Sequence, residues 1–96
     1  MSNKALWEVL DNIKIQNTDE MYEETFHEKI EAAMEGYEVE EWDHDDFAAS
    51  EIAESTIEWI ADMSKGKIVE DLQVGTWWTE DEDACFTVVV IKTKEA

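Results

Sequence analysis

The chain has 96 residues, and its 26 acidic residues stand against only seven basic ones, which gives a formal net charge of −19. A protein this acidic repels the phosphates of nucleic acids and the headgroups of anionic lipids, because both bind proteins through Lys and Arg. We therefore expect no direct binding to DNA, RNA or a membrane surface.

The composition is that of a folded domain, since 44% of the residues are apolar, ten are aromatic and none is proline. A chain of this length predicts a single domain over residues 1–96. Residues 84–91 form the longest mainly apolar run, which is too short to span a bilayer. Cys85 is the one cysteine, so no intrachain disulfide can form. These features favour a soluble cytoplasmic protein, located in the host cytoplasm if a virus encodes it.

The first part of the chain predicts two amphipathic helices. Ser2 is the expected N-cap of a helix over residues 3–14, in which apolar residues recur at helical spacing. Thr18 is the expected N-cap of a second helix, which Gly36 ends. The apolar stripe of this second helix consists of Tyr22, Phe26, Ile30, Ala33 and Met34. Residues 37–42 alternate weakly and are predicted to be either a short strand or extended chain.

The middle of the chain predicts a third helix. Asp43 or Asp45 is its expected N-cap, and it runs to near Ser64, where Gly66 ends it. Its predicted apolar side carries Ala49, Ile52, Ala53, Thr56, Ile57, Ile60 and Met63.

The end of the chain predicts a β-hairpin, because the apolar period changes there from 3.6 to 2. Residues 68–79 and 84–93 are rich in β-branched and aromatic residues, and the acidic residues 80–83 form the turn between them. We therefore predict an α+β fold, in which three helices pack on a small antiparallel β-sheet formed mainly by this C-terminal hairpin.

The register of the hairpin sorts its side chains into two faces. A four-residue loop pairs Thr79 with Ala84. The face predicted to be the core then carries Leu72, Val74, Trp78, Val89 and Ile91. The opposite face carries Trp77, Phe86, Val88 and Val90, beside Gln73, Gly75 and Lys92. This second face is too apolar to be fully solvated, so a helix or another molecule should cover it, and a homodimer through it is one alternative.

The negative charge is concentrated in one segment of the chain. Residues 17–62 contain seventeen acids and one lysine, a net charge of −16. Residues 1–16 contain two acids and two lysines, and residues 63–96 contain seven acids and four lysines. Both ends of the chain are therefore close to neutral.

Within this segment, the acids form two rows of similar spacing and a cluster between them. The second helix carries Glu24, Glu28, Glu31 and Glu35, with Glu20 and Glu23 beside them. The third helix carries Glu51, Glu54, Glu58 and Asp62. The connection adds Glu38, Glu40, Glu41, Asp43, Asp45 and Asp46. Each row places a carboxylate roughly every 5 to 6 Å along its helix, against one phosphate per roughly 3.4 Å along a DNA strand.

Two interpretations of the acidic segment are open. A solvated face, or an adaptation to high salt, should spread acids over the whole chain, whereas both ends are nearly balanced. The other interpretation is a surface that imitates nucleic acid and binds a basic nucleic-acid-binding protein. In charge pattern, residues 17–62 resemble the small acidic DNA-mimic inhibitors of phages and plasmids, which act on restriction, CRISPR or repair nucleases. The resemblance implies a stoichiometric inhibitor of a host defence or nucleic-acid-processing protein.

Five tryptophans are a high number for this length. Trp59 and Trp78 are expected in the core, and Trp7 is a further candidate for it. Trp42 and Trp77 are each either a partner-binding anchor or a half-buried residue at the edge of the core. As anchors, they would suit an alternative function, that of an immunity or antitoxin protein which neutralises a basic nuclease toxin by direct contact.

No catalytic motif is present, and we expect a protein that is not an enzyme and has no cofactor. Glu24 and His27 have the E-x-x-H spacing of di-metal helical bundles, but the sequence lacks the second copy that such sites need. Adventitious binding of a divalent cation could involve Glu23, His27, Glu31 and His44, and no functional metal site is predicted. Cys85 falls on the hairpin face of Trp78 and is expected to be an inert buried thiol.

Overall fold

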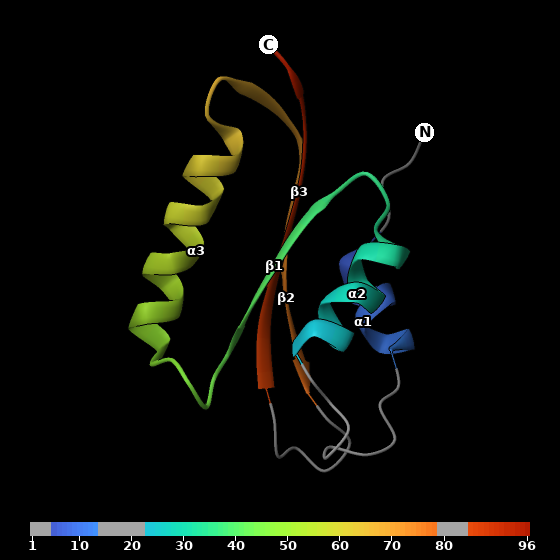
Figure 1. The fold of residues 1–96 in the computed structure, drawn as a ribbon, viewed down its shortest axis with the longest axis vertical. Helices are drawn as coiled ribbons and strands as arrows, with labels where there is room; N and C mark the ends of the chain where they lie inside the picture. The colour runs from blue at the N-terminus through green and yellow to red at the C-terminus, as the bar shows by residue number, and fades with distance from the viewer. Residues whose placement is uncertain (1–4, 14–22, 79–84) are drawn as a thin grey trace.

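The structure is a computed structural model that describes residues 5–13, 23–78 and 85–96, except for the side chains of residues 23–25. Its elements, in chain order, are α1 (Leu6–Asn12), α2 (Glu23–Ala33), β1 (Glu38–Asp43), α3 (Ala49–Ser64), β2 (Lys67–Trp78) and β3 (Cys85–Glu95). The fold is the predicted mixture of three helices and an antiparallel sheet, in which β2 and β3 form the C-terminal hairpin (Figure 1). The weakly alternating residues 37–42 belong mainly to β1, so the strand alternative is confirmed.

The three strands are antiparallel and lie in the order β1-β3-β2, so β3 is central. Trp78 pairs with Cys85 and Leu72 pairs with Ile91, which is the register that a four-residue loop predicts. Thr79 and Ala84, the expected closing pair, lie outside the described residues. Between Val69 and Asp71 a β-bulge shifts the register by one residue.

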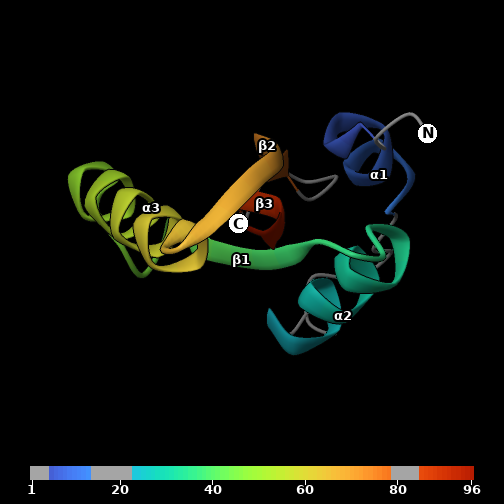
Figure 2. The same cartoon turned by 90° about the horizontal axis from the view of Figure 1, so that it is seen from above.

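The helices cover both faces of this sheet. Seen from above, α1 and α2 lie on one side of the sheet and α3 on the other (Figure 2). The larger core forms beneath α1 and α2, where the Phe26 ring lies 4.7 Å from the Trp77 ring and 5.0 Å from the Phe86 ring between centroids. A smaller core forms beneath α3 from Trp42, Ile52, Val89, Trp59 and Ile60. No helix in the described ranges is long and apolar enough to cross a membrane.

The two faces of the hairpin agree with the prediction on β3 and differ from it on β2. Trp77, Phe86, Val88 and Val90 are buried in the larger core, so helices of the same chain cover the face considered for a homodimer. On the face expected to be the core, Val89 and Ile91 of β3 are buried. The β2 side chains of that face, Leu72, Val74 and Trp78, are exposed instead.

Gly75 provides a physical reason for this difference. A Cβ atom at this position would lie 3.0 Å from Leu10 Cδ1 and 3.3 Å from Leu6 Cδ2. The missing side chain lets α1 pack closely on β2, so two helices share the Gly75 face of the sheet. The other face has only α3 among the described helices, and its packed cluster takes Val89 from the central strand and Trp42 from β1.

On α3 itself, the predicted apolar side is only partly correct. Ile52 is buried, and Thr56, Ile60 and Met63 are half-buried. Ala49, Ala53 and Ile57 are exposed, although all three were expected to face the core. Only a narrow stripe of α3 contacts the sheet. Among the described residues, no other element covers the two sides of this helix, which therefore stay exposed.

The N-terminus of α1 is capped from another element. Ala5, its N-cap residue, makes no side-chain hydrogen bond, and the Leu6 N–H donates to Gln73 Oε1 of β2 at 2.7 Å. Gln73 Nε2 donates to Asp71 Oδ2 at 2.8 Å, and the Tyr37 hydroxyl donates to the same oxygen at 2.5 Å. This chain of bonds fixes α1 to the sheet beside the larger core.

The Tyr37 bond changes the acidity of both partners. The pKa of the Asp71 carboxyl lies below its ordinary value, first because of the hydrogen bond from Tyr37. Burial, together with the bond and charge of Asp71, raises the pKa of Tyr37 to about 12. The pair is therefore a neutral phenol and a carboxylate at ordinary pH.

The predicted N-caps find no support in the structure. Ser2 and Thr18 lie outside the described residues. The expectation of Asp43 or Asp45 is wrong, since α3 begins at Ala49 after an Ala48 N-cap without a side-chain bond. Asp43 Oδ1 instead accepts a hydrogen bond from the Asp45 N–H at 2.9 Å, which stabilises the turn before the helix.

The close approach at Gly75 predicts the effect of a substitution. Gly75→Val should lower the free energy of unfolding by about 1–3 kcal/mol in urea titrations, because the added side chain collides with Leu10. Val74→Ile, which adds a methyl group on the exposed face, is the control and should change it little. Adding Leu10→Ala to Gly75→Val should cost less than the sum of the two single changes. A fully stable Gly75→Val protein would contradict the packing of α1 on β2.

Candidate functional site

The acidic segment crosses one broad face of the molecule. In Figure 1, α3, β1 and α2 lie side by side with β1 in front of the other strands, and Figure 2 places α1 and β2 toward the opposite side. We call this the acidic surface. Its described and exposed acids are Glu28, Glu31, Glu35, Glu38, Asp45, Asp46, Glu51, Glu54, Glu58 and Asp62. Glu40, Glu41 and Asp43 are half-buried members of it.

The row on α2 exists because the opposite stripe of this helix is in the core. Phe26, Ile30 and Met34 are completely buried. Residues at steps of three and four on the other side therefore point to solvent, which exposes Glu28, Glu31 and Glu35. Two further members of the predicted set, Glu23 and Glu24, belong to α2, but their side chains lie outside the described part, as does the whole of Glu20.

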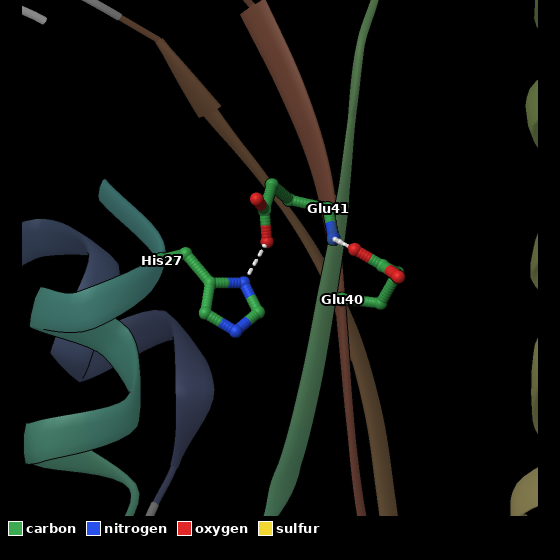
Figure 3. A group of neighbouring side chains, drawn as sticks. All are labelled: His27, Glu40 and Glu41. Carbon is green, nitrogen blue, oxygen red and sulfur yellow. Dashed lines mark hydrogen bonds and ion pairs between the residues drawn. The ribbon is translucent and has the colours of Figure 1, made fainter. Parts of the chain in front are cut away.

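His27 joins this row to the sheet. Its Nδ1 atom lies 2.5 Å from Glu41 Oε2 of β1, and its Nε2 atom is hydrogen-bonded to Glu31 on the next helical turn. Glu41 has a side chain that is only 8% exposed, so the imidazole covers a nearly buried carboxylate. His27 of α2 consequently faces the edge strand β1 (Figure 3).

The charge of His27 follows from these two contacts. Partial burial lowers its pKa, but the hydrogen bonds and charges of Glu41 and Glu31 together outweigh burial and raise the pKa above the usual 6.5. A doubly protonated ring can donate from both nitrogens, whereas a neutral ring can donate from only one. The arrangement therefore favours the imidazolium form.

His27, Glu40 and Glu41 also resemble a cation site, since each offers a ligand atom within 4.8 Å of the others. Figure 3 shows His27 and Glu41 meeting on one side of β1, with the Glu40 carboxylate on the other side. There the Glu40 carboxylate accepts a hydrogen bond from the Glu41 N–H at 3.1 Å. His44, which was expected to join such a group, contacts Thr87 Oγ1 at 2.7 Å instead. The geometry is that of a hydrogen-bonded cluster, with both nitrogens of His27 already engaged.

The row on α3 lies to one side of its helix. Ile52, Thr56 and Met63 turn toward the sheet, and α3 rises from the lower to the upper end of the molecule in Figure 1. By helical spacing, Glu51, Glu54, Glu58 and Asp62 share one flank of α3, whereas Ala53 and Ile57 share the opposite flank.

The two rows do not form one flat surface, because α2 and α3 lie on opposite faces of the sheet. They are joined instead around the edge strand β1 and the turn that follows it. Glu38, Glu40 and Glu41 occupy the strand, and Asp45 and Asp46 occupy the turn. In chain order, β1 and the turn after it connect the helix that carries one row to the helix that carries the other.

Four of the five tryptophans differ from the expectation. Trp42 and Trp77 are 8% and 5% exposed, so both are core residues and neither is a surface anchor. Trp78, expected in the core, and Trp7, a candidate for it, are 57% and 65% exposed, whereas Trp59 of α3 is half-buried against the smaller core as expected. Trp77 and Trp78 exchange places together, because neighbours on a strand point to opposite sides.

Cys85 is buried and free, as expected for an inert thiol. Burial raises its pKa above the ordinary value, and the charges of Asp43 and Asp45 raise it further. A thiol of this kind is a poor nucleophile at neutral pH.

No protein-family model, curated protein or solved structure matches this chain. Its function therefore has to be inferred from its own surface. The contact that sequence reasoning missed is His27 with Glu41, since the two residues are fourteen positions apart and only the packing of α2 on β1 brings them together. The sequence did place the imidazole of His27 on the predicted row of acids, but it gave no indication that Glu41 is its partner.

The raised pKa of His27 predicts how stability depends on pH. A base whose folded pKa is raised contributes stability that is complete below the unfolded pKa and is lost as pH rises through the folded pKa. The melting temperature should therefore be higher at pH 6 than at pH 8, and His27→Gln should reduce this difference. His44→Gln is the matched control and should keep it. An unchanged pH profile in His27→Gln would show that the contacts with Glu31 and Glu41 do not govern it.

Proposed function

We propose that this protein is a stoichiometric, non-catalytic inhibitor that occupies the nucleic-acid-binding groove of a basic host defence or nucleic-acid-processing protein. The carboxylates of the acidic surface take the place of phosphates. The observation that carries the proposal is the segregation of charge over the described residues. Lys29 is the single lysine of residues 23–62, whereas the other described lysines are Lys65, Lys67, Lys92 and Lys94.

This segregation is energetically unfavourable for the isolated protein. Like charges at i,i+4 destabilise a helix by about 0.2–0.5 kcal/mol per pair, and α3 contains no lysine to offset the row from Glu51 to Asp62. Mixing lysines into the exposed positions would remove the repulsion without disturbing the core. A basic partner that binds the acidic surface supplies positive charge, and this offsets the repulsion between the carboxylates.

The molecule is large enough for a specific interface. Its principal-axis extents are 43 × 31 × 18 Å, so its broadest side can accommodate the roughly 800 Å² that one protein contributes to a standard interface. Its field attracts a basic groove over long range and speeds association, while repelling nucleic acid and other acidic proteins.

The alternative of an immunity or antitoxin protein loses its specific support. It relied on Trp42 and Trp77 as rigid anchors among the acids, and both side chains lie in the core. No exposed aromatic residue is found among the described side chains of β1, and the exposed Trp78 belongs to β2.

Competition with nucleic acid tests the proposed function. Immobilised protein should retain nucleic-acid-binding proteins from a nuclease-treated cell extract at low salt. Duplex DNA or RNA should release them, because it competes for the same groove, while polyglutamate at equal charge concentration should release far less. Retained proteins that stay bound under saturating DNA and RNA would contradict the proposal.

Charge reversals separate the acidic surface from overall charge. Glu54→Lys/Glu58→Lys on α3 should weaken binding to a retained partner about tenfold or more at low salt. Glu28→Lys on α2, combined with Glu35→Lys in the turn after it, should do the same. Glu70→Lys/Glu95→Lys is the matched control, since both residues are exposed on β2 and β3 and the net charge changes equally. Titration calorimetry over a range of salt concentrations measures the affinities. Equal losses in all three variants would show that net charge, and not the surface, determines binding.

A further inference from the structure

His27 is a basic side chain set inside the acidic surface. Its Nδ1 atom lies 2.5 Å from the carboxylate of Glu41 on β1, and its Nε2 atom is hydrogen-bonded to Glu31 on the next turn of α2. Both contacts become ion pairs when the ring carries its second proton. Lys29 is the single lysine of residues 23–62, so a protonated His27 is a substantial counter-charge for the acids around it.

Acids face this ring from both of the elements it joins. Among the described side chains, Glu31 faces it from α2 and Glu41 faces it from β1, and Glu40 of β1 has a carboxylate oxygen within 4.8 Å of a ring nitrogen. Burial lowers the pKa of the ring, but the hydrogen bonds and charges of Glu41 and Glu31 outweigh burial and raise it above 6.5. The protonated ring is therefore stabilised by carboxylates that a basic partner would also seek.

The three side chains differ in how far a partner can reach them. The Glu31 side chain is 54% exposed and that of His27 is 27% exposed, whereas that of Glu41 is only 8% exposed. A lysine or arginine of a partner therefore meets Glu31 first. A carboxylate that binds a guanidinium through both oxygens has less capacity left for the N–H of His27.

We propose that His27 is a built-in counter-ion of the acidic surface, which releases its proton to the solvent when a basic partner binds, so that the partner is held more tightly at alkaline than at acidic pH. The inference rests on the proposed function, since it concerns how the acidic surface binds its basic partner. It adds regulation by pH to that binding.

Two effects of the partner act in the same direction. Its cations compete with the His27 N–H for the Glu31 carboxylate, and they repel a positively charged ring beside them. Both effects disfavour the imidazolium form, so the pKa of His27 is lower in the complex than in the free protein. A partner that prefers the neutral ring binds more tightly as pH rises between these two values, by about tenfold for a pKa difference of about one.

The free protein responds to pH in the opposite sense. The contribution of His27 to the stability of the fold is lost as pH rises, because its contacts with Glu31 and Glu41 favour the charged ring. Binding to a basic partner gains over the same range, because the same charge opposes it. The two responses can therefore be measured separately on one protein.

A blocked oligoarginine peptide is the probe for this proton release. Guanidinium groups stay charged throughout the range in which histidine titrates, so a short peptide of arginines with an acetylated and an amidated end adds no titrating group. Titration calorimetry at low salt should show that the protein binds it about threefold or more tightly at about pH 8.5 than at about pH 6. The full chain is used throughout.

Substitutions of His27 separate its charge from a structural role. His27→Gln imitates the neutral ring, so it should bind the peptide more tightly than the wild type at about pH 6 and lose most of the pH dependence. His27→Lys keeps a permanent charge and should bind more weakly than His27→Gln at both pH values. His44→Gln is the matched control and should keep most of the pH dependence, since His44 contacts the Thr87 hydroxyl and not an acid. Circular dichroism and melting curves establish that the variants fold.

Nuclear magnetic resonance observes the proton directly. The chain has two histidines, so His27 is the single imidazole in His44→Gln and its ring signal is assigned without ambiguity. Titration of that signal should give a pKa that the peptide lowers by about half a unit or more.

Three results would overturn the inference. They are a ring signal that titrates at the same pH with and without the peptide, an equal pH dependence of binding in the wild type and His27→Gln, and weaker binding of His27→Gln than of the wild type at about pH 6. Each of them leaves the proposed function standing, because that function fails on a different result, namely retained proteins that DNA and RNA do not release.

Discussion

The architecture depends on the burial of both faces of β3. Val88, Val89, Val90 and Ile91 are completely buried, although consecutive residues of a strand point to opposite sides. A strand that is apolar on both faces must be covered on both, as in sheets that lie between helices. This requirement separates α2 from α3 and makes β1, the strand that connects them, one edge of the sheet. The three-layer arrangement follows from it.

The same constraint divides the molecule electrostatically. α2, β1 and α3 are consecutive in the chain and carry most of its acids, so the negative charge is concentrated on these elements. Among the described residues, β2 carries two acids, and its exposed side chains include Leu72, Val74 and Trp78. Charge and exposed apolar surface are therefore concentrated on different elements.

Polar side chains connect the layers where the apolar core ends. His27 bridges α2 and β1 through Glu41, and Gln73 ties the N-terminus of α1 to β2. Asp71, Tyr37 and Gln73 satisfy one another, and Lys92 lies 5.8 Å from the centroid of the Tyr37 ring. Buried polar groups need such partners, because an unsatisfied one would destabilise the fold. Each of these contacts joins residues from different elements, which is why spacing along the chain did not reveal them.

Local patterns in the sequence were sufficient for the three helices, the hairpin and its register, since helical spacing, alternation and loop length act over a few residues. The weak alternation of residues 37–42 left a strand and extended chain open, and pairing with β3 decided for the strand. The sequence also located the excess charge, which is a property of composition. Which face of β2 is buried depends on tertiary packing, because α1 packs closely against Gly75. As a result, Trp77 lies in the core and Trp78 on the surface. The matching spacing of the two acid rows likewise did not determine whether they lie together, because a helix on either face of a sheet can carry the same row. Packing on both sides of β3 placed the two rows on helices at opposite faces of the sheet.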